Sequence, residues 1–497
     1  MEIRVHILII YSKTRLAMYK KLVLLGFILS AFKLSAQEVW SLEKCVSTAQ
    51  ENNRTIKQSQ ISVKNAQLIN KQDRFSVYPT VNGSSNLGFN FGRSVNPATY
   101  QFENISTRYN GINVSANMTL YNGGRIQNQI KQSAVDIQAA QADLEQTAQT
   151  ISLQVAQAYL QILLNEEQFA NAKKKAQTTL SQLDRIEKQI SAGSLPSNAR
   201  YDLAAQAARD EQAIVSASNS VELSYLNLKN LLELSPDKDM KIEAPSVVVP
   251  ADANPDGFSF KTVYNQALTN QPQIRAGESR IKSAEIGVKI AEAALLPSLF
   301  LSGNLNSNFS STIKDFTKAK TTAVPFTQTG TATINGQTAP VSFTFNQTVL
   351  SDAPKKPYFN QIGDNFGQGL GLNLQVPIWD GYQRKTAIQR QQLNVESQSI
   401  ALERTKQQLK SDVQNAIASA RAAQKQYNAA KKTFDAQQAA FSAMEKRFQI
   451  GAANGFEYAQ SRIQLDTAER DVVVAKYDYL FRLKIVDFYE GKKLTLK

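Results

Sequence analysis

Two very long stretches without glycine or proline constrain this chain more than any other feature of its sequence. One runs from Arg125 to Ala192 and the other from Arg384 to Ile450, each about 67 residues long. Because glycine and proline are the residues least compatible with a helix interior, each stretch is predicted to form one helix. At a rise of 1.5 Å per residue such a helix reaches roughly 100 Å, which no compact globular domain needs.

Each long helix is predicted to turn back at a glycine. Gly193 and Gly451 follow the two stretches, and helical patterning resumes over 198–235 and 456–490. Apolar residues recur at helical spacing among alanine, serine and glutamine, so neighbouring helices can approach closely and pack as a coiled coil. The sequence therefore predicts two antiparallel helical hairpins, with the long helices at 125–192 and 384–450.

The second half of the chain repeats the first half. Residues 49–56 align with 267–274 at an offset of 218, and residues 120–123 align with 378–381 at an offset of 258. The offset grows from 218 to 258, so the second half carries 40 additional residues. Such self-similarity is typical of an internally duplicated fold.

We assign residues 37–250 to a first structural repeat and residues 251–497 to a second. Each is expected to contain a helical segment, two strands and one long hairpin. The initial helical segments are placed at 39–78 and 258–296, and each ends at a proline. The predicted fold class is therefore mainly α with a small β part.

Four segments alternate between apolar and polar residues with the period of a strand: 80–92, 109–121, 298–309 and 367–378. One face of each is apolar and the other is polar but mostly uncharged. Segments of about ten residues have the length of tilted transmembrane strands.

A soluble β-sandwich would also show alternation, but two features favour a membrane sheet. The strands number only four, and aromatic residues mark the points where strand meets helix, as expected at a membrane interface. These interface aromatics are Tyr78, Tyr121 and Trp379.

Four strands cannot close a barrel, and open strand edges are not tolerated in lipid. The chain is therefore expected to complete its barrel by oligomerisation. Two copies would give eight strands and a filled bore, whereas three copies would give twelve strands and leave room for a channel. This argument favours three or more copies without fixing the number.

The N-terminus has the pattern of a cleavable export signal. Basic residues at 20–21 precede a short apolar run and then the small residue Ala36. This pattern predicts a signal peptide over 1–36, whose apolar run is too short to cross a bilayer. Because Met18 stands just before the basic pair, residues 1–17 are interpreted as an over-extended start.

Composition excludes several classes of function. The formal net charge is +14, but the basic residues are dispersed without a dense run, which argues against nucleic acid as a partner. His6 lies within the signal, so the mature chain has no histidine and one cysteine, Cys45. Histidine-based catalysis, His/Cys metal sites and internal disulfides are ruled out. We expect no enzyme activity and no catalytic, cofactor-binding or metal-binding residues.

Two further segments have more than one interpretation. Gly367, Gly369 and Gly371 suggest a nucleotide loop, but Leu372 replaces the third glycine and no helix follows, so a strand facing a crowded barrel wall fits better. The insertion at 310–362 contains a predicted hairpin with an Asn-Gly turn. It is expected to be an extracellular loop that covers the mouth, meets other surface molecules or simply varies, and we favour the last.

The chain resembles the TolC-like outer-membrane efflux channels. The resemblance rests on the signal peptide, the duplication, Tyr-Asn-Gly-Gly-Arg at 121–125, Trp-Asp-Gly at 379–381 and the two glycine turns. It covers roughly 40–490. It implies a homotrimer with a twelve-stranded barrel in the outer membrane of a Gram-negative bacterium and an α-helical barrel across the periplasm. It also implies docking to a periplasmic adaptor and an energised inner-membrane pump or ABC-type transporter.

The resemblance further implies a constriction at the periplasmic hairpin tips. The family's two acidic positions fall six and nine residues after the second glycine turn, at Glu457 and Gln460, so the second acid is lost. The family's basic partner is replaced by Ala453. Asp202 occupies the equivalent of the second position in the first repeat and would supply a compensating charge. The alternative for each of these positions is an ordinary solvated helix residue.

One rival interpretation comes from another class of protein. A soluble periplasmic adaptor or scaffold would also use long helical hairpins, bridging membranes without spanning one. It would lack amphipathic strands of membrane length and would usually carry a single hairpin, whereas this sequence predicts two hairpins and four such strands. We therefore expect a passive outer-membrane exit duct for small molecules or secreted substrates.

Overall fold

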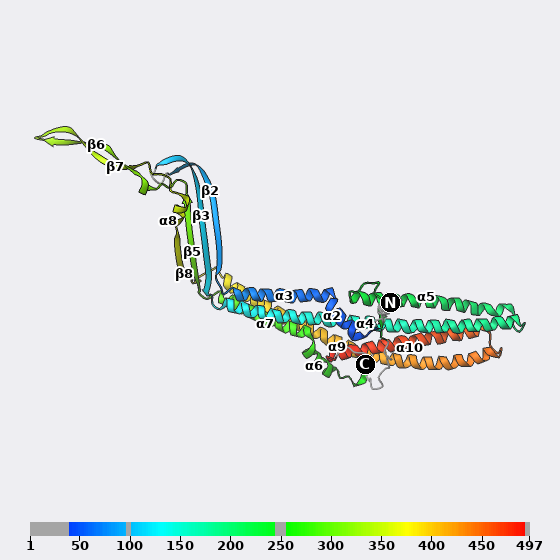
Figure 1. The fold of residues 1–497 in the computed structure, drawn as a ribbon. Coiled ribbons are helices and arrows are strands. Elements are labelled where there is room, and N and C mark those ends of the chain that lie inside the picture. The colour runs from blue at the N-terminus through cyan, green and yellow to red at the C-terminus, as the bar shows by residue number, and fades with distance from the viewer. Residues whose placement is uncertain (1–38, 96–100, 244–254, 493–497) are drawn as a thin grey trace, which may run out of the picture. The chain divides into compact units, whose positions relative to one another are not determined.

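The computed structural model describes residues 39–95, 101–243 and 255–492 (Figure 1). The predicted signal peptide at 1–36 lies outside these residues. Most of the described chain is helical, and a smaller part forms strands. None of the described helices has an apolar stretch long enough to cross a membrane.

The helices of the two repeats match one another in length. In the first repeat α2 (Leu42–Asn52), α3 (Arg54–Phe75) and α4 (Arg125–Ser191) have 11, 22 and 67 residues. In the second repeat α6 (Phe260–Asn270), α7 (Pro272–Ala293) and α9 (Gln383–Gln449) have the same three lengths. The returning helices are α5 (Arg200–Leu231), which follows the short helix η1 (Ser197–Ala199), and α10 (Gly455–Tyr489).

The single helical segments predicted at 39–78 and 258–296 are each two helices, so that prediction was wrong in one respect. The breaks fall at Asn53 and Gln271, whose backbones are extended with ψ of 128° and 122°. Asn53 Oδ1 accepts a hydrogen bond from the backbone N–H of Thr55 at 2.9 Å and so caps α3. In the second repeat Pro272 takes the first helical position, where its missing N–H costs nothing.

The chain forms two compact units, and each repeat contributes to both. Of the described residues, the hairpin unit contains those within 1–64, 138–278 and 400–497, and the sheet unit contains those within 65–137 and 279–399. The repeats are therefore duplications of sequence and not separate folding units.

The core of the hairpin unit forms around a short parallel strand pair, β1 (Val39–Trp40) with β4 (Lys241–Ile242). The buried hydroxyl of Tyr159 donates to the carbonyl oxygens of Trp40 at 3.1 Å and Glu243 at 2.6 Å. The free thiol of Cys45 is fully buried in the same core, and burial raises its pKa to about 12.

The four alternating segments pair in one antiparallel sheet of order β2-β3-β5-β8. Its strands are β2 (Thr80–Val95), β3 (Phe102–Tyr121), β5 (Ser298–Ser310) and β8 (Gly367–Gln375). β2 and β3 extend beyond the predicted 80–92 and 109–121. β8 stops before the predicted residue 378, since Pro377 has no N–H for a ladder hydrogen bond.

The register sorts the side chains of this sheet onto two faces. Residues directly opposite one another share a face, and Val114, for example, pairs with Gly83 on one side and Leu305 on the other. The apolar face carries Val81, Leu87, Phe89, Phe91, Ile112, Val114, Met118, Leu301, Leu305, Leu370, Leu372 and Leu374. The opposite face carries asparagines at 82, 86, 90, 113, 117, 304, 306, 308 and 373.

Glycines on the polar face make room for these asparagines. A Cβ at Gly369 would lie 2.5 Å from Asn304 Oδ1, and one at Gly367 would lie 3.0 Å from Asn306 Oδ1. The alternate glycines of β8 are therefore explained by crowding across the sheet, and they form no nucleotide loop.

The insertion contains the predicted hairpin. β6 (Lys320–Ile334) and β7 (Gln337–Ser351) have 15 residues each. Asn335 and Gly336 have φ of 52° and 81°, which is the geometry of a type I′ turn. A seven-residue helix, α8 (Tyr358–Asp364), then leads into β8.

Two equivalent glycines allow a matched test of packing in the sheet unit. Gly123 and Gly381 both have positive φ, 69° and 65°. A Cβ at Gly123 would lie 2.6 Å from the carbonyl oxygen of Ala293, whereas one at Gly381 would meet no atom within 4 Å. We expect Gly123→Ala to lower the free energy of unfolding by about 1–3 kcal/mol more than Gly381→Ala, because only the first adds overpacking to backbone strain. Denaturant unfolding of the extracted protein measures both, and equal losses would contradict the close contact.

Candidate functional site

Both long helices end in the same type of glycine cap. At the end of α4, Ser194 N donates to Gln189 O at 2.9 Å, and Gly193 N donates to Ile190 O at 2.9 Å. At the end of α9, Ala452 N donates to Arg447 O at 2.8 Å, and Gly451 N donates to Phe448 O at 3.1 Å. With φ of 71° and 76°, the two glycines complete Schellman motifs, which reverse the chain at the hairpin tips.

The return helix α10 begins with a capping box. The N–H of Glu457 donates to Asn454 Oδ1 at 2.9 Å, and the Glu457 carboxylate accepts from the N–H of Asn454 at 3.4 Å. The exposed Glu457 therefore stabilises the start of α10. Its side chain is held beside the glycine turn by this contact.

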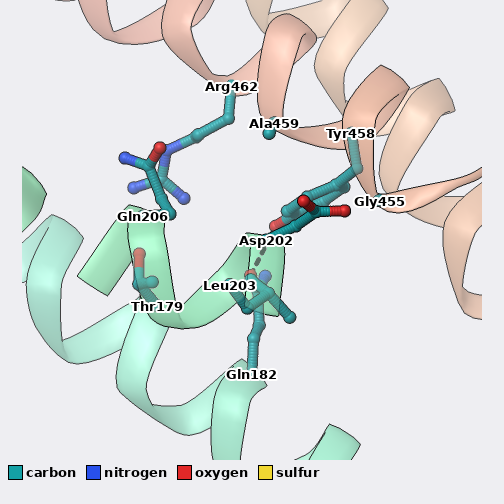
Figure 2. Close-up of a pocket in the computed structure, with 9 residues that line it drawn as sticks. All are labelled: Thr179, Gln182, Asp202, Leu203, Gln206, Gly455, Tyr458, Ala459 and Arg462. Carbon is teal, nitrogen blue, oxygen red and sulfur yellow. Dashed lines mark hydrogen bonds between the residues drawn. The ribbon is translucent and has the colours of Figure 1, made fainter. Parts of the chain in front are cut away.

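The two hairpins meet near their tips through Tyr458 (Figure 2). Its ring packs against Phe441 and Phe448, with centroids 5.4 Å and 4.7 Å away. Its hydroxyl donates to Gln182 Oε1 on α4 at 2.6 Å. Burial raises the pKa of Tyr458, which keeps the phenol protonated as the donor.

A second contact between the hairpins joins the starts of the two return helices. Asp202, in the first turn of α5, faces Gly455, the first residue of α10 (Figure 2). A Cβ at Gly455 would lie 2.8 Å from Asp202 Oδ2, so only glycine allows this carboxylate to approach so closely.

A buried polar cluster lies about two turns further along α5. Asp210, only 6% exposed, accepts hydrogen bonds from the Thr179 hydroxyl at 2.5 Å and from Gln206 Nε2 at 2.8 Å. Thr179 lies on α4 and Gln206 on α5, so the carboxylate joins the two helices of the first hairpin. A buried carboxylate needs such partners to offset the loss of its hydration.

Arg462 of α10 is also buried, at 7% exposure. Burial disfavours its charge, but the adjacent Asp466 carboxylate, 3.0 Å from Nε, outweighs that effect and the pKa of Arg462 is raised. Lys175 of α4 reaches Asp466 at 3.1 Å and Glu469 at 3.0 Å. These charges tie the first hairpin to the second through α4 and α10.

The tips enclose an open groove of about 820 Å³. Four of the residues singled out from the sequence line it: Asp202, Gly451, Ala453 and Glu457. Gly193 and Gln460 are exposed but are not among its lining residues. Within the described residues no group of histidine, cysteine, aspartate and glutamate could hold a metal ion.

The family model for outer membrane efflux proteins matches residues 45–234 and 263–484 of this chain. The chain belongs to the outer membrane efflux protein family. It is therefore an outer-membrane exit duct for efflux that extends into the periplasm, and the rival adaptor interpretation is not favoured.

Solved channels show that this efflux protein has the fold of the family. CusC superposes with a TM-score of 0.69 at 16% identity, covering 93% of this chain and 96% of that one. VceC from Vibrio cholerae gives 0.67 at 15% identity, covering 91% and 96%. CmeC from Campylobacter jejuni gives 0.68 at 17% identity, covering 90% and 85%.

One curated relative matches a shorter stretch of the efflux protein. Toxin and drug export protein A from Aggregatibacter actinomycetemcomitans is 30% identical over 105 residues. The match covers 20% of this chain and spans about a fifth, 22%, of that relative.

The three aromatic residues predicted to lie at the membrane interface are strongly exposed in the efflux protein. Trp379 is 81% exposed, and Tyr78 and Tyr121 are also on the surface. A β-bulge between Thr119 and Tyr121 shifts the register of β3, so Tyr121 pairs with Leu299 and joins the apolar face. The sequence places these aromatics at the strand ends, but it does not reveal the bulge.

Sequence reasoning missed the polar residues that join the helices of the efflux protein. Gln206 and Asp210, and likewise Arg462 and Asp466, are four residues apart, a spacing that indicates contact along one helix. No local spacing reveals Thr179 as the partner of Asp210, because 31 residues separate them.

The buried Asp210 gives a prediction about the first hairpin. Asp210→Asn keeps the shape of the side chain but removes its charge and offers the Thr179 hydroxyl and Gln206 amide a poorer acceptor. We expect this substitution to lower the free energy of unfolding by about 1.5–3 kcal/mol, since hydrogen bonds to charged groups contribute that much. Hydrogen exchange of α4 and α5 near the tip should accelerate accordingly. The exposed Asp202→Asn is the matched control, and equal exchange in the two variants would contradict a joining role for Asp210.

Proposed function

We propose that three copies of this chain close a twelve-stranded barrel and form a passive duct through the outer membrane. The observation that carries the proposal is the sheet with two free edges and an exposed apolar face. β2 and β8 each have a neighbour on one side only within the described sheet, and Leu370 on β8 is 81% exposed. In lipid, the backbone groups of both edges need partners from another chain.

The strand order supports closure between identical copies. Neighbouring strands are antiparallel throughout, and the sheet has an even number of strands. β8 of one copy would therefore lie antiparallel to β2 of the next, and the pattern continues around a ring. Twelve strands leave an open bore, whereas eight would fill it with side chains.

The polar face would line this bore. Its asparagines, serines and glycines bear no charge, so the wall offers hydrogen bonds to many solutes without selecting ions of one sign. Such a wall suits a passive exit for small molecules or secreted substrates. Energy for transport would come from an inner-membrane pump or ABC-type transporter, reached through a periplasmic adaptor.

The hairpin tips would form the periplasmic constriction. Asp202 and Glu457 line the same groove and are the acidic members of the positions that the family resemblance indicates. Gln460 brings no charge, and Ala453 offers no basic partner. Gly193 and Gly451 would act by turning the chain at this end. Glu445 adds a third acid to this groove, and Arg185 and Arg447 are the two basic residues that line it. In this proposal the tip is therefore mildly acidic and favours cations.

Assembly is the first test. The full-length protein, extracted from outer membranes in mild detergent, should have the mass of three chains by light scattering and should conduct ions in planar bilayers. A monomer in the soluble periplasmic fraction would contradict the proposed barrel.

The acidic constriction has a separate test. Glu457→Gln removes the charge but keeps a side chain that can complete the capping box, so the tip should fold normally. We expect the cation-to-anion permeability ratio in planar bilayers to fall, and charge reversal by Glu457→Lys should lower it further. Glu187→Gln, an exposed change on α4 outside the groove, is the control. Unchanged selectivity in both Glu457 variants would remove this residue from the constriction.

A further inference from the structure

A short helix lies on the apolar face of the sheet, at the end where β5 finishes and β8 begins. α8 follows the hairpin β6–β7 and packs against β5. The Tyr358 ring lies 4.9 Å from that of Phe309, and its hydroxyl donates to Asn110 Oδ1 at 2.6 Å. Asn110 and Phe309 pair with each other on the face that carries the apolar side chains. The side chain of Gln361 bonds both backbone groups of Ser310 and fixes α8 in place.

α8 gives the apolar face a second aromatic boundary. Phe359 is 83% exposed, and Phe366, just beyond the helix, is also exposed. From Tyr121 to Asn110 the strand rises roughly 37 Å at about 3.4 Å per residue, or about 26 Å when tilted by 45°. That span agrees with the apolar band of roughly 25 Å in outer-membrane barrels.

Charged residues appear only beyond the end of this apolar band. The segments 80–92 and 109–121, together with β5 and β8, contain no charged residue. Directly beyond them Arg93 lies over the Phe102 ring at 5.1 Å, and Arg108 lies over the Phe309 ring at 5.8 Å. By register both arginines belong to the apolar face.

Two lysines at this end oppose each other directly. Lys314 and Lys355 form an antiparallel bridge beside the start of α8. The flanking hydrogen bonds run from Asp315 N to Pro354 O at 2.7 Å and from Lys356 N to Ile313 O at 3.0 Å. The lysines are therefore a non-hydrogen-bonded pair, the geometry that brings cross-strand side chains closest. Like charges in such a pair repel and destabilise it.

The neighbouring acidic side chains already have hydrogen-bond or ion-pair partners. The Asp315 carboxylate accepts from the Thr317 hydroxyl at 2.6 Å and lies 3.7 Å from Lys318, and hydrogen bonding to Thr317 lowers the pKa of Asp315. Asp364 forms an ion pair with Lys356. No acidic side chain in the described part of the chain lies within ion-pair distance of Lys314 or Lys355, and both lysines are exposed.

We propose that Lys314 and Lys355 bind the phosphate groups of anionic lipid in the outer leaflet, with Arg108 and Arg93 adding positive charge at the same end of the sheet. A phosphate between the two lysines would replace their repulsion by two charge-assisted contacts. Phe359 and Phe366 would lie among the acyl chains directly below. This inference rests on the proposed barrel, because it requires the apolar face to meet lipid.

A lipid explains the site better than a free anion does. The cations lie beside exposed aromatic side chains at one boundary of an apolar band, and that combination fits a headgroup with attached acyl chains. A free phosphate would use the lysines but would leave the Phe359 side chain exposed to water.

The experiment measures binding of diphosphoryl lipid A to the full-length trimer in mild detergent, once trimer mass and conductance are established. We expect saturable binding that Lys314→Gln/Lys355→Gln weakens roughly 30-fold, given about 1 kcal/mol for each basic residue near an anionic surface. Lys314→Arg/Lys355→Arg should bind like the wild type. The control Lys131→Gln/Lys289→Gln removes the same charge from exposed helix positions in the sheet unit and should have no effect.

The outcomes separate the inference from the proposed function. Equal lipid binding by the wild type and the Lys314→Gln/Lys355→Gln variant, both trimeric and conducting, would overturn the inference and leave the channel intact. Full competition by inorganic phosphate at equal concentration would show a free-anion site and would also overturn it. A chain that fails to trimerise fails the earlier assembly test instead.

Discussion

Every backbone N–H and C=O of a strand that lies in lipid must find a partner, and this requirement governs the sheet. A sheet of four antiparallel strands satisfies its interior and leaves β2 and β8 open. Closure by identical copies is the simplest solution, since an even strand number keeps the ring antiparallel. The register then determines which side chains lie on each face of the sheet, with leucine and phenylalanine on one face and asparagine on the other. The glycines of β8 follow from the same register, because they make room for the asparagines opposite.

The helical hairpins have a different requirement. The chain must reverse direction after each helix of 67 residues while the backbone groups at the helix ends keep hydrogen-bond partners. Glycine in the left-handed conformation satisfies the last carbonyls of each long helix, and Asn454 with Glu457 satisfies the first amides of α10. Glu457 thus has a structural task whether or not its charge also faces a pore. Tyr458, Asp210 and Lys175 then join neighbouring helices through polar contacts.

Much of the fold could be predicted because its signals are local and periodic. The absence of glycine and proline predicted α4 and α9 to within a residue or two of their ends, and the duplication predicted corresponding elements in the two halves. The breaks at Asn53 and Gln271 were missed although local signals were present, since Asn53 caps α3 through Thr55, two residues further on, and Gln271 is followed by Pro272. The contact between Thr179 and Asp210, the bulge before Tyr121 and the seating of α8 on β5 involve partners distant in sequence. No periodicity encodes them.

The sheet unit and the hairpin unit of the proposed duct have different tasks. The strand segments that would cross the apolar core of the membrane carry no charge on either face, so the barrel wall can neither bind lipid phosphate nor sort ions. In the sheet unit, Lys314 and Lys355 oppose each other just beyond these segments, where contact with lipid headgroups is proposed. In the hairpin unit, Asp202 and Glu457 line the groove at the tips, where discrimination among ions is proposed. A neutral barrel wall explains how one duct could pass substrates of different charge, with their selection left to the energised partner.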